Sequence, residues 1–224
     1  MRRIPEPELM VDPVQVRAYA EADFEVPHAH CAALLIDRLA PLRASGAALD
    51  LGCGAADITL RVARALPRWT LDGIDGSAPM IEFGRRSAAA AGLEGRVRLH
   101  EMRLPVGGFP EPAYDLLFSN SLLHHLPSPE TLWSAVRAAS APGAQVFVMD
   151  LQRPESEEEV EALVRCYARD EPEILRHDFE ASLFAAYRAG EVREQLAAAG
   201  LDRLCVEVVS DRHWIAWGQV AGEA

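Results

Sequence analysis

The sequence predicts a three-layer α/β domain whose mainly parallel seven-stranded sheet ends in an antiparallel hairpin. Short apolar runs alternate with helical patterns along most of the chain, which is typical of parallel strands joined by crossover helices. Two of these runs, residues 114–120 and 146–150, are almost continuously apolar, as expected for central strands covered on both faces. The last two runs, residues 203–209 and 213–220, are separated by only three residues, and so short a connection requires an antiparallel pair.

The first apolar run begins at residue 47, reaches Asp50, passes through a bend with Gly52 and Gly54, and enters a helical pattern. In such a unit a nucleotide-like ligand can approach the backbone, because glycine permits a tight turn and carries no Cβ. The next run, residues 69–75, ends in Asp75 about twenty residues further on, where this kind of fold places the acid that binds ribose hydroxyls. The two motifs together predict a nucleotide-type ligand site.

Length, charge and cysteine content limit the classes of protein that the sequence can represent. The chain of 224 residues is half apolar, which is enough for one domain over residues 1–224 with a sizeable core. Its net charge of −12 disfavours a nucleic-acid partner, because no basic stripe is present to neutralise phosphates. The four cysteines are scattered, and neither a membrane-spanning run nor the apolar core of a signal peptide is found. We therefore expect a cytoplasmic protein without a membrane partner, whose oligomeric state the sequence leaves open.

Segments on both sides of the ligand unit are predicted to cover it. Residues 1–13, with three prolines, are expected to form an extended arm, and helical patterns over residues 14–26 and 28–42 complete an N-terminal lid (1–42). An insert over residues 153–189 is expected to form a helical cap, opened by a capping box at Ser156 and Glu159. The candidate substrate-binding residues lie in these two segments: Tyr19, Phe24, Arg176, Phe179, Ser182 and Tyr187. Ordinary packing is the competing interpretation for Tyr19 and Phe24.

Four short motifs resemble those of one protein family. Residues 49–54 (Leu-Asp-Leu-Gly-Cys-Gly) resemble the first motif of the class I S-adenosylmethionine-dependent methyltransferases, and residues 73–77 resemble the second. Residues 119–126 resemble the fourth-strand segment of the small-molecule members, and residues 142–144 resemble the turn before the fifth strand. The resemblance covers residues 45–152 and, more loosely, the terminal hairpin. It implies a Rossmann-like methyltransferase fold with S-adenosylmethionine as cofactor and S-adenosylhomocysteine as product.

The resemblance also implies roles for individual residues. Asp50 would face the methionine amine, the backbone of Gly52, Cys53 and Gly54 would pass against the ligand, and Asp75 would bind the ribose diol. Asn120 would offer its backbone carbonyl to the ligand amine.

Three further residues stand at adenine-contacting positions of the family, namely Met80, Glu101 and Met102, although Glu101 replaces the more usual aspartate. The sequence departs from the family at Ala56, which replaces the third glycine, and Asp57 beside it is within possible reach of the ligand. The cofactor-binding candidates are therefore Asp50, Gly52, Cys53, Gly54, Asp57, Asp75, Gly76, Met80, Glu101, Met102, Asn120, Ser121 and His125.

A sulfonium is already an activated alkyl donor, so the main task of the implied enzyme is to align the acceptor, the methyl carbon and the leaving sulfur. No nucleophilic side chain is required and none is indicated, so the catalytic residue stays unassigned among Tyr19, Asn120 and His125. His124 and His125 are adjacent, and we expect them to point in different directions rather than to chelate an ion. The sequence therefore predicts no metal site, and a positioning or packing role is favoured for His125.

The leading hypothesis is methyl transfer from S-adenosylmethionine to a small-molecule acceptor that the sequence does not identify. A second hypothesis is a cyclase, in which the ligand's own amine attacks its γ-carbon, forms azetidine-2-carboxylate and releases methylthioadenosine. A third is a module that binds S-adenosylmethionine without turnover. The acidic charge makes RNA and DNA the least favoured acceptors.

Overall fold

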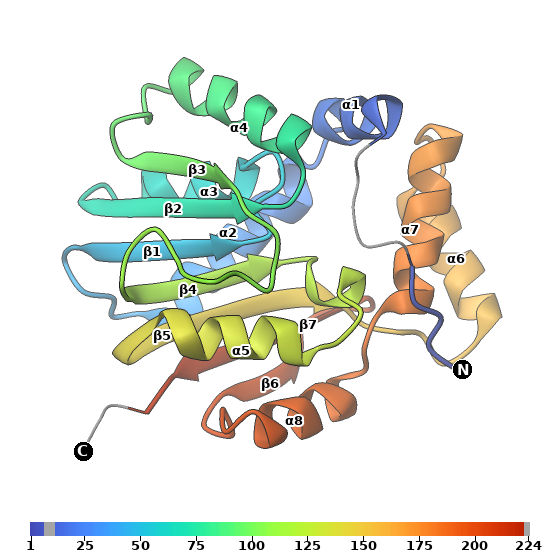
Figure 1. Ribbon diagram of the computed structural model, residues 1–224. Helices are drawn as coiled ribbons and strands as arrows, with labels where there is room; N and C mark the ends of the chain where they lie inside the picture. Colours follow the sequence, from blue (N-terminus) through green and yellow to red (C-terminus); the bar gives the residue numbers. More distant parts are fainter. Residues whose placement is uncertain (7–11, 222–224) are drawn as a thin grey trace.

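The sheet of the computed structural model, which describes residues 1–6 and 12–221, has seven strands in the order β3-β2-β1-β4-β5-β7-β6 (Figure 1). Neighbouring strands from β3 to β5 are parallel, and β7 is antiparallel to both β5 and β6. The predicted fold class is therefore confirmed. The strands are β1 (Gly46–Leu51), β2 (Trp69–Asp75), β3 (Val97–Glu101), β4 (Tyr114–Asn120), β5 (Ser140–Leu151), β6 (Cys205–Val208) and β7 (His213–Gln219).

Helices cover both faces of this sheet, and each face has its own apolar core. Side chains of α2, α3 and α4 pack with Phe118 and Phe147 on one face. Side chains of α5 and α8 pack with Leu117 and Val146 on the other face. The helices are α1 (Pro13–Glu21), α2 (Glu25–Leu39), α3 (Asp57–Ala65), α4 (Ala78–Ala90), α5 (Glu130–Ala139), α6 (Glu157–Tyr167), α7 (Glu173–Ala185) and α8 (Ala189–Ala198), with the short 3₁₀ turn η1 (Leu123–His125).

Strand β5 is longer than the predicted run of residues 146–150, because it begins at Ser140. Pro142 and Gly143, expected in a turn before the strand, lie inside it at a register shift against β4, where Gly143 has a φ of 74°. A glycine tolerates this left-handed backbone, so the irregularity is absorbed without ending the strand.

Three helices lie beyond the carboxyl ends of the parallel strands, and we call α1, α6 and α7 the roof (Figure 1). Helix α1 contacts both α4 and α7, and α7 contacts α6 and the η1 turn. Gln15 of α1 donates a hydrogen bond to Asp178 of α7 (2.8 Å), and α6 and α7 share a small apolar core around Leu183. The roof therefore extends over the strand ends, from α1 beside α4 to α6 and α7.

Within the predicted lid, residues 1–42, helix α1 lies in the roof, whereas most of α2 packs elsewhere. Leu35 and Leu39 of α2 are buried against α3 and the sheet, so this helix belongs to a core layer. Helix α2 ends at Leu39 because Ala40, which precedes Pro41, has extended backbone angles. Part of the predicted arm, residues 7–11, lies outside the described residues, and residues 1–6 form no helix or strand. Among the described residues, no helix is long and apolar enough to cross a membrane.

Candidate functional site

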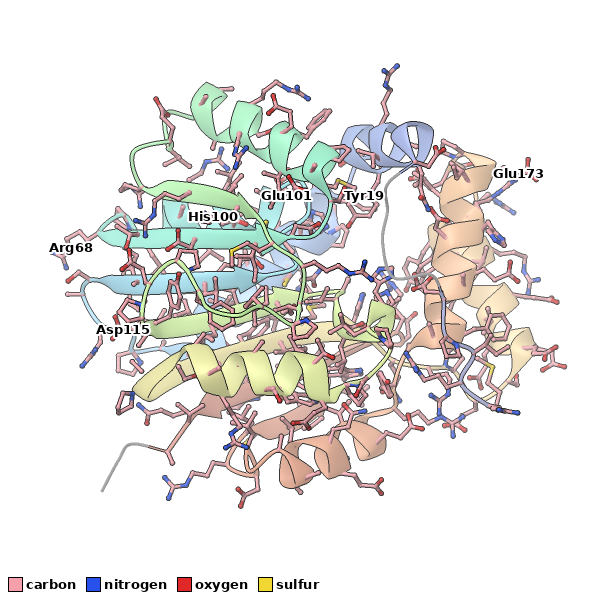
Figure 2. The ribbon with its side chains drawn as sticks, viewed as in Figure 1. Tyr19, Arg68, His100, Glu101, Asp115 and Glu173 are labelled. Atoms are coloured by element: carbon pink, nitrogen blue, oxygen red, sulfur yellow. The ribbon has the colours of Figure 1, made fainter. Side chains whose placement is uncertain are left out.

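The predicted ligand residues lie along the carboxyl edge of the sheet, beneath the roof. Asp50 and Asp75 stand near the ends of β1 and β2, and Glu101 and Asn120 end β3 and β4. Figure 2 shows Tyr19 and Glu101 at this edge, whereas Arg68 and Asp115 lie at the opposite edge. Because all four strands run in the same direction, residues from distant parts of the sequence meet at one side.

The loop between β1 and α3 has left-handed backbone at Gly52 (φ 74°), Gly54 (φ 51°) and Ala56 (φ 66°). The amides of Gly52 and Cys53 both donate to the Ile74 carbonyl, at 2.9 and 3.0 Å, which fixes the loop against the end of β2. A Cβ at position 52 would lie 2.8 Å from the end of the Leu122 side chain, which would have to shift, and the left-handed backbone also favours glycine here. Ala56 occupies its position because Gly84 of α4 leaves room for the buried Ala56 methyl group.

Asp75 is oriented by two backbone amides at the end of β2. Gly54 donates to Oδ2 (3.0 Å) and Ser77 donates to Oδ1 (2.8 Å). Burial raises the pKa of Asp75, and the two amide hydrogen bonds oppose this shift. Each carboxylate oxygen can accept more than one hydrogen bond, so Asp75 keeps acceptor capacity for the hydroxyls of a ribose.

Asp50 is almost fully buried, and the Thr59 hydroxyl donates to its Oδ2 at 2.6 Å. Burial raises the pKa of Asp50 to about 7, with a further increase from the charge of Asp75. A ligand amine beside this carboxyl would favour its charged form. Sequence reasoning missed Thr59, whose signal is a hydroxyl in the first turn of the helix after the glycine loop.

Asp57 has structural partners that sequence reasoning did not include. Its Oδ2 accepts from His28 Nδ1 and Arg61 Nε, both at 2.8 Å, and Arg61 also binds Glu25. Burial raises the pKa of Asp57, but the bonds to His28 and Arg61 outweigh it, so the net shift is downward. Asp57 therefore joins the first turn of α2 to α3, and a ligand contact for it stays a prediction.

Tyr19 and Phe24 form an aromatic stack with His28 near the strand ends. The Tyr19 and Phe24 ring centroids are 4.8 Å apart, and those of Phe24 and His28 are 5.0 Å apart. Burial and the charges of Asp75 and Asp57 raise the pKa of Tyr19 to about 12. The Tyr19 ring thus lies near Asp75, and the Phe24 ring lies between those of Tyr19 and His28.

The positions implied for adenine contact also gather at this edge. Met80 is buried in the first turn of α4, and the Met102 amide donates to the Asp75 carbonyl (2.9 Å). Glu101 is exposed at the end of β3, and Gly76 follows Asp75 directly.

The chain reverses after β4, where Asn120 donates to the Ser121 hydroxyl (3.1 Å) and Ser121 has a φ of 55°. In the η1 turn that follows, the rings of His124 and His125 lie side by side, with centroids 4.2 Å apart. The expectation that these rings point in different directions is therefore wrong. Successive residues of a 3₁₀ turn are about 120° apart rather than on opposite faces as in a strand, so the two rings can converge.

Glu6 and Asp150 surround this histidine pair. Glu6 Oε1 lies 3.4 Å from His124 Nε2 and 3.1 Å from His125 Nδ1, and His124 Nδ1 lies 2.5 Å from Asp150 Oδ1. Burial raises the pKa of Glu6. Burial alone would lower the pKa of His124, but Asp150 and Glu6 raise it overall, and His124 keeps the pKa of Asp150 low despite burial. Sequence reasoning missed Glu6 and Asp150.

The substrate candidates of the insert divide into three groups. Ser182 is buried and donates to Glu6 Oε1 (3.0 Å). The guanidinium carbon of Arg3 lies over the Tyr187 ring, 4.1 Å from the centroid of that ring. Phe179 packs in the small apolar core of the roof. Arg176 is exposed and lines a surface hollow between α6 and α7. Because the helix turns this side chain outward, it lies away from the histidine pair.

Comparison with known proteins identifies related sequences. Residues 49–146 match the family described as "Methyltransferase domain". The chain is 31% identical over 154 residues to trans-aconitate 2-methyltransferase of Methylobacterium radiotolerans. This alignment covers 66% of this chain and 54% of that protein. It is 36% identical over 91 residues to ribosomal RNA small subunit methyltransferase C of Escherichia coli, covering 41% of this chain and 25% of that protein. The chain thus spans between a quarter and about half of the length of these curated relatives.

Solved structures agree with the fold. A S-adenosylmethionine-dependent methyltransferase from Aquifex aeolicus superposes with a TM-score of 0.68 at 15% identity, covering 95% of this chain and all of that one. A plantazolicin methyltransferase in complex with S-adenosylhomocysteine superposes with a TM-score of 0.63 at 11% identity, covering 91% of this chain and 85% of that one. Residues 49–146 therefore match a methyltransferase domain, and the whole chain has the fold of solved S-adenosylmethionine-dependent methyltransferases.

Proposed function

We propose that this chain binds S-adenosylmethionine at the carboxyl edge of β1, β2 and β4 and transfers its methyl group to a small-molecule acceptor. The observation that carries this proposal is the pair of backbone amides, from Gly54 and Ser77, that hold Asp75 beside the left-handed glycine loop. A ribose diol would bind Asp75, and the methionine amine would bind the charged form of Asp50. In the reaction, the acceptor atom forms a bond to the methyl carbon, the carbon–sulfur bond breaks, and the sulfonium becomes the neutral thioether of S-adenosylhomocysteine.

A small acceptor is favoured by the roof and by charge. Helix α1 crosses from α4 to α7 above the strand ends, which leaves less room for a macromolecule than an open edge would. The net charge of −12 opposes an approach of RNA. The curated relatives include enzymes for both trans-aconitate and ribosomal RNA, and the match to the RNA enzyme covers the smaller share of each chain. We therefore infer a small acceptor held between the roof and the end of β4.

The test has two stages with purified full-length protein. Calorimetry should first give binding of S-adenosylmethionine and S-adenosylhomocysteine, with weaker binding in Asp75→Asn and unchanged binding in the distant variant Asp115→Asn. Mass spectrometry should then detect S-adenosylhomocysteine only when a suitable acceptor from a panel of small carboxylic acids, phenols and amines is added. Methylation of ribosomal RNA instead would overturn the acceptor class.

The same assay covers the other hypotheses. Accumulation of methylthioadenosine and azetidine-2-carboxylate from S-adenosylmethionine alone would show a cyclase and would overturn methyl transfer. Binding without any product across the whole panel would favour a module without turnover. Absence of binding in folded protein would overturn the proposed cofactor.

A further inference from the structure

We propose that Glu6, His124 and His125 form a binding site for a divalent transition-metal cation of the zinc type. The three side chains converge from two distant segments, the N-terminal residues and the η1 turn after β4. Each residue offers one ligand atom, and the three ligand atoms all lie within 4.8 Å of one another. Two imidazoles with one carboxylate are a donor set found in zinc sites that keep an open position, and calcium and magnesium prefer oxygen ligands.

The separations of the donor atoms suit a tetrahedral cation. Zinc–ligand bonds of about 2.0–2.1 Å at tetrahedral angles place neighbouring donors about 3.3 Å apart. Glu6 Oε1 is 3.4 Å from His124 Nε2 and 3.1 Å from His125 Nδ1, so two of the three edges already have this length. Closing around a cation therefore requires adjustment mainly of the third separation, between the two imidazole nitrogens.

Asp150 supplies the support that a metal-binding histidine requires. It accepts from His124 Nδ1 at 2.5 Å, and its two oxygens also accept the backbone amides of Leu123 and Leu151, both at 2.7 Å. Because Asp150 engages Nδ1, the Nε2 atom of His124 faces Glu6. A carboxylate that holds the second ring nitrogen in this way is the usual partner of a metal-bound histidine.

Charge and exposure at the cluster also fit a cation. Three carboxylates contribute negative charge at this cluster, namely those of Glu6, Asp150 and Asp178. Arg3 contributes positive charge beside His124. A dication would thus leave the group close to neutral when both imidazoles are neutral. The side chains of Glu6 and His124 are only 9% and 2% exposed, whereas that of His125 is 29% exposed. A fourth ligand, such as water or an acceptor oxygen, can therefore reach the cation from the His125 side.

The test uses chelator-treated full-length protein titrated with cobalt(II) chloride, whose visible absorption reports tetrahedral nitrogen and oxygen ligands. One equivalent should bind, and Glu6→Gln and His125→Gln should each weaken binding at least tenfold. The matched controls Glu173→Gln and His177→Gln carry the same changes on exposed α7 positions, with Glu173 at the outer end of that helix (Figure 2), and should bind like the wild type.

Three outcomes would overturn this site: no stoichiometric binding, binding that both variants retain, or a thiolate charge-transfer band showing that Cys166 or Cys205 holds the ion. Circular dichroism and thermal melting verify that each variant is folded, and either variant alone decides if the other is unstable. Cobalt binding requires no S-adenosylmethionine, so failure here and failure of the proposed methyl transfer are distinguishable.

Discussion

The carboxyl group of Asp50 combines a folding cost with a proposed role in ligand binding. Burial raises its pKa to about 7 from 3.8, so the folded protein holds this proton more tightly than the unfolded chain. The contribution of this protonated carboxyl to the free energy of unfolding is complete below about pH 4 and is lost as the pH rises through 7. Above pH 7 the ligand-free protein therefore contains an unfavourable buried charge.

We predict that Asp50→Asn raises the melting temperature at pH 8 and changes it little at pH 4, because asparagine does not ionise. The same variant should bind S-adenosylmethionine at least tenfold more weakly, since the ligand amine loses its charged partner. Calorimetric melting at both pH values, with and without ligand, measures the two effects. A stabilisation that does not depend on pH would contradict the assigned cause.

Gly52 is required by backbone conformation and by space together, and the two requirements can be separated. Gly52→Ala places a side chain at a φ of 74° and 2.8 Å from Leu122, whereas Gly92→Ala meets a φ of 65° with open space around it. Both variants should lose about 1–2 kcal/mol of stability to the left-handed backbone. We predict that Gly52→Ala loses more and also loses ligand affinity, as chemical denaturation and calorimetry would show. Equal effects of the two substitutions would argue against close packing at Gly52.

At the scale of elements, Gly84 sets the distance between α4 and the loop before α3. A Cβ at this position would lie 2.7 Å from Leu99 Cδ1, 3.0 Å from Ala56 Cβ and 3.2 Å from the Ala55 carbonyl. Gly190 is also helical, and a Cβ there meets nothing within 4 Å.

Both Gly84→Ala and Gly190→Ala gain helix propensity, worth roughly 0.5–1 kcal/mol. We predict that Gly190→Ala is neutral or stabilising, whereas Gly84→Ala lowers the free energy of unfolding and weakens S-adenosylmethionine binding by shifting the loop. Urea denaturation and ligand titration measure these effects. Stabilisation by Gly84→Ala without a loss of affinity would show that α4 can move away freely.

At the scale of the whole molecule, the N-terminal residues connect the roof to the end of β4. Arg3 donates to the carbonyls of Ala185 (2.6 Å) and His124 (3.0 Å) and lies over the ring of Tyr187. The first residues are thereby fixed to segments that lie more than a hundred positions away in the sequence.

We predict that Arg3→Ala makes the N-terminus more sensitive to limited proteolysis and raises the KM for the acceptor, because the segment that carries Glu6 is released. The neighbouring variant Arg2→Ala changes an exposed side chain and should behave like the wild type. Mass spectrometry of the cleavage products and initial rates measure these effects. Equal protection in both variants would contradict this role of Arg3.

The sequence by itself determined the order and type of most strands and the shape of the glycine loop. These features depend on local patterns: apolar runs such as residues 114–120, the short connection before β7, and glycines where the backbone must be left-handed. The placement of Asp50 and Asp75 at one edge was predictable because parallel strands bring their carboxyl ends together, and their ligand contacts stay predictions. Ala56 was expected as a mild departure, and the structure gives the reason in Gly84.

Only the tertiary structure decided what surrounds this edge. Glu6, the histidine pair and Asp150 meet through contacts between distant segments, and no local periodicity encodes such contacts. The burial of α2 in a layer and the outward position of Arg176 likewise depend on which helix face finds a partner. Local physical chemistry fixes φ angles and strand alternation, whereas the position of a long side chain depends on all the segments that pack around it.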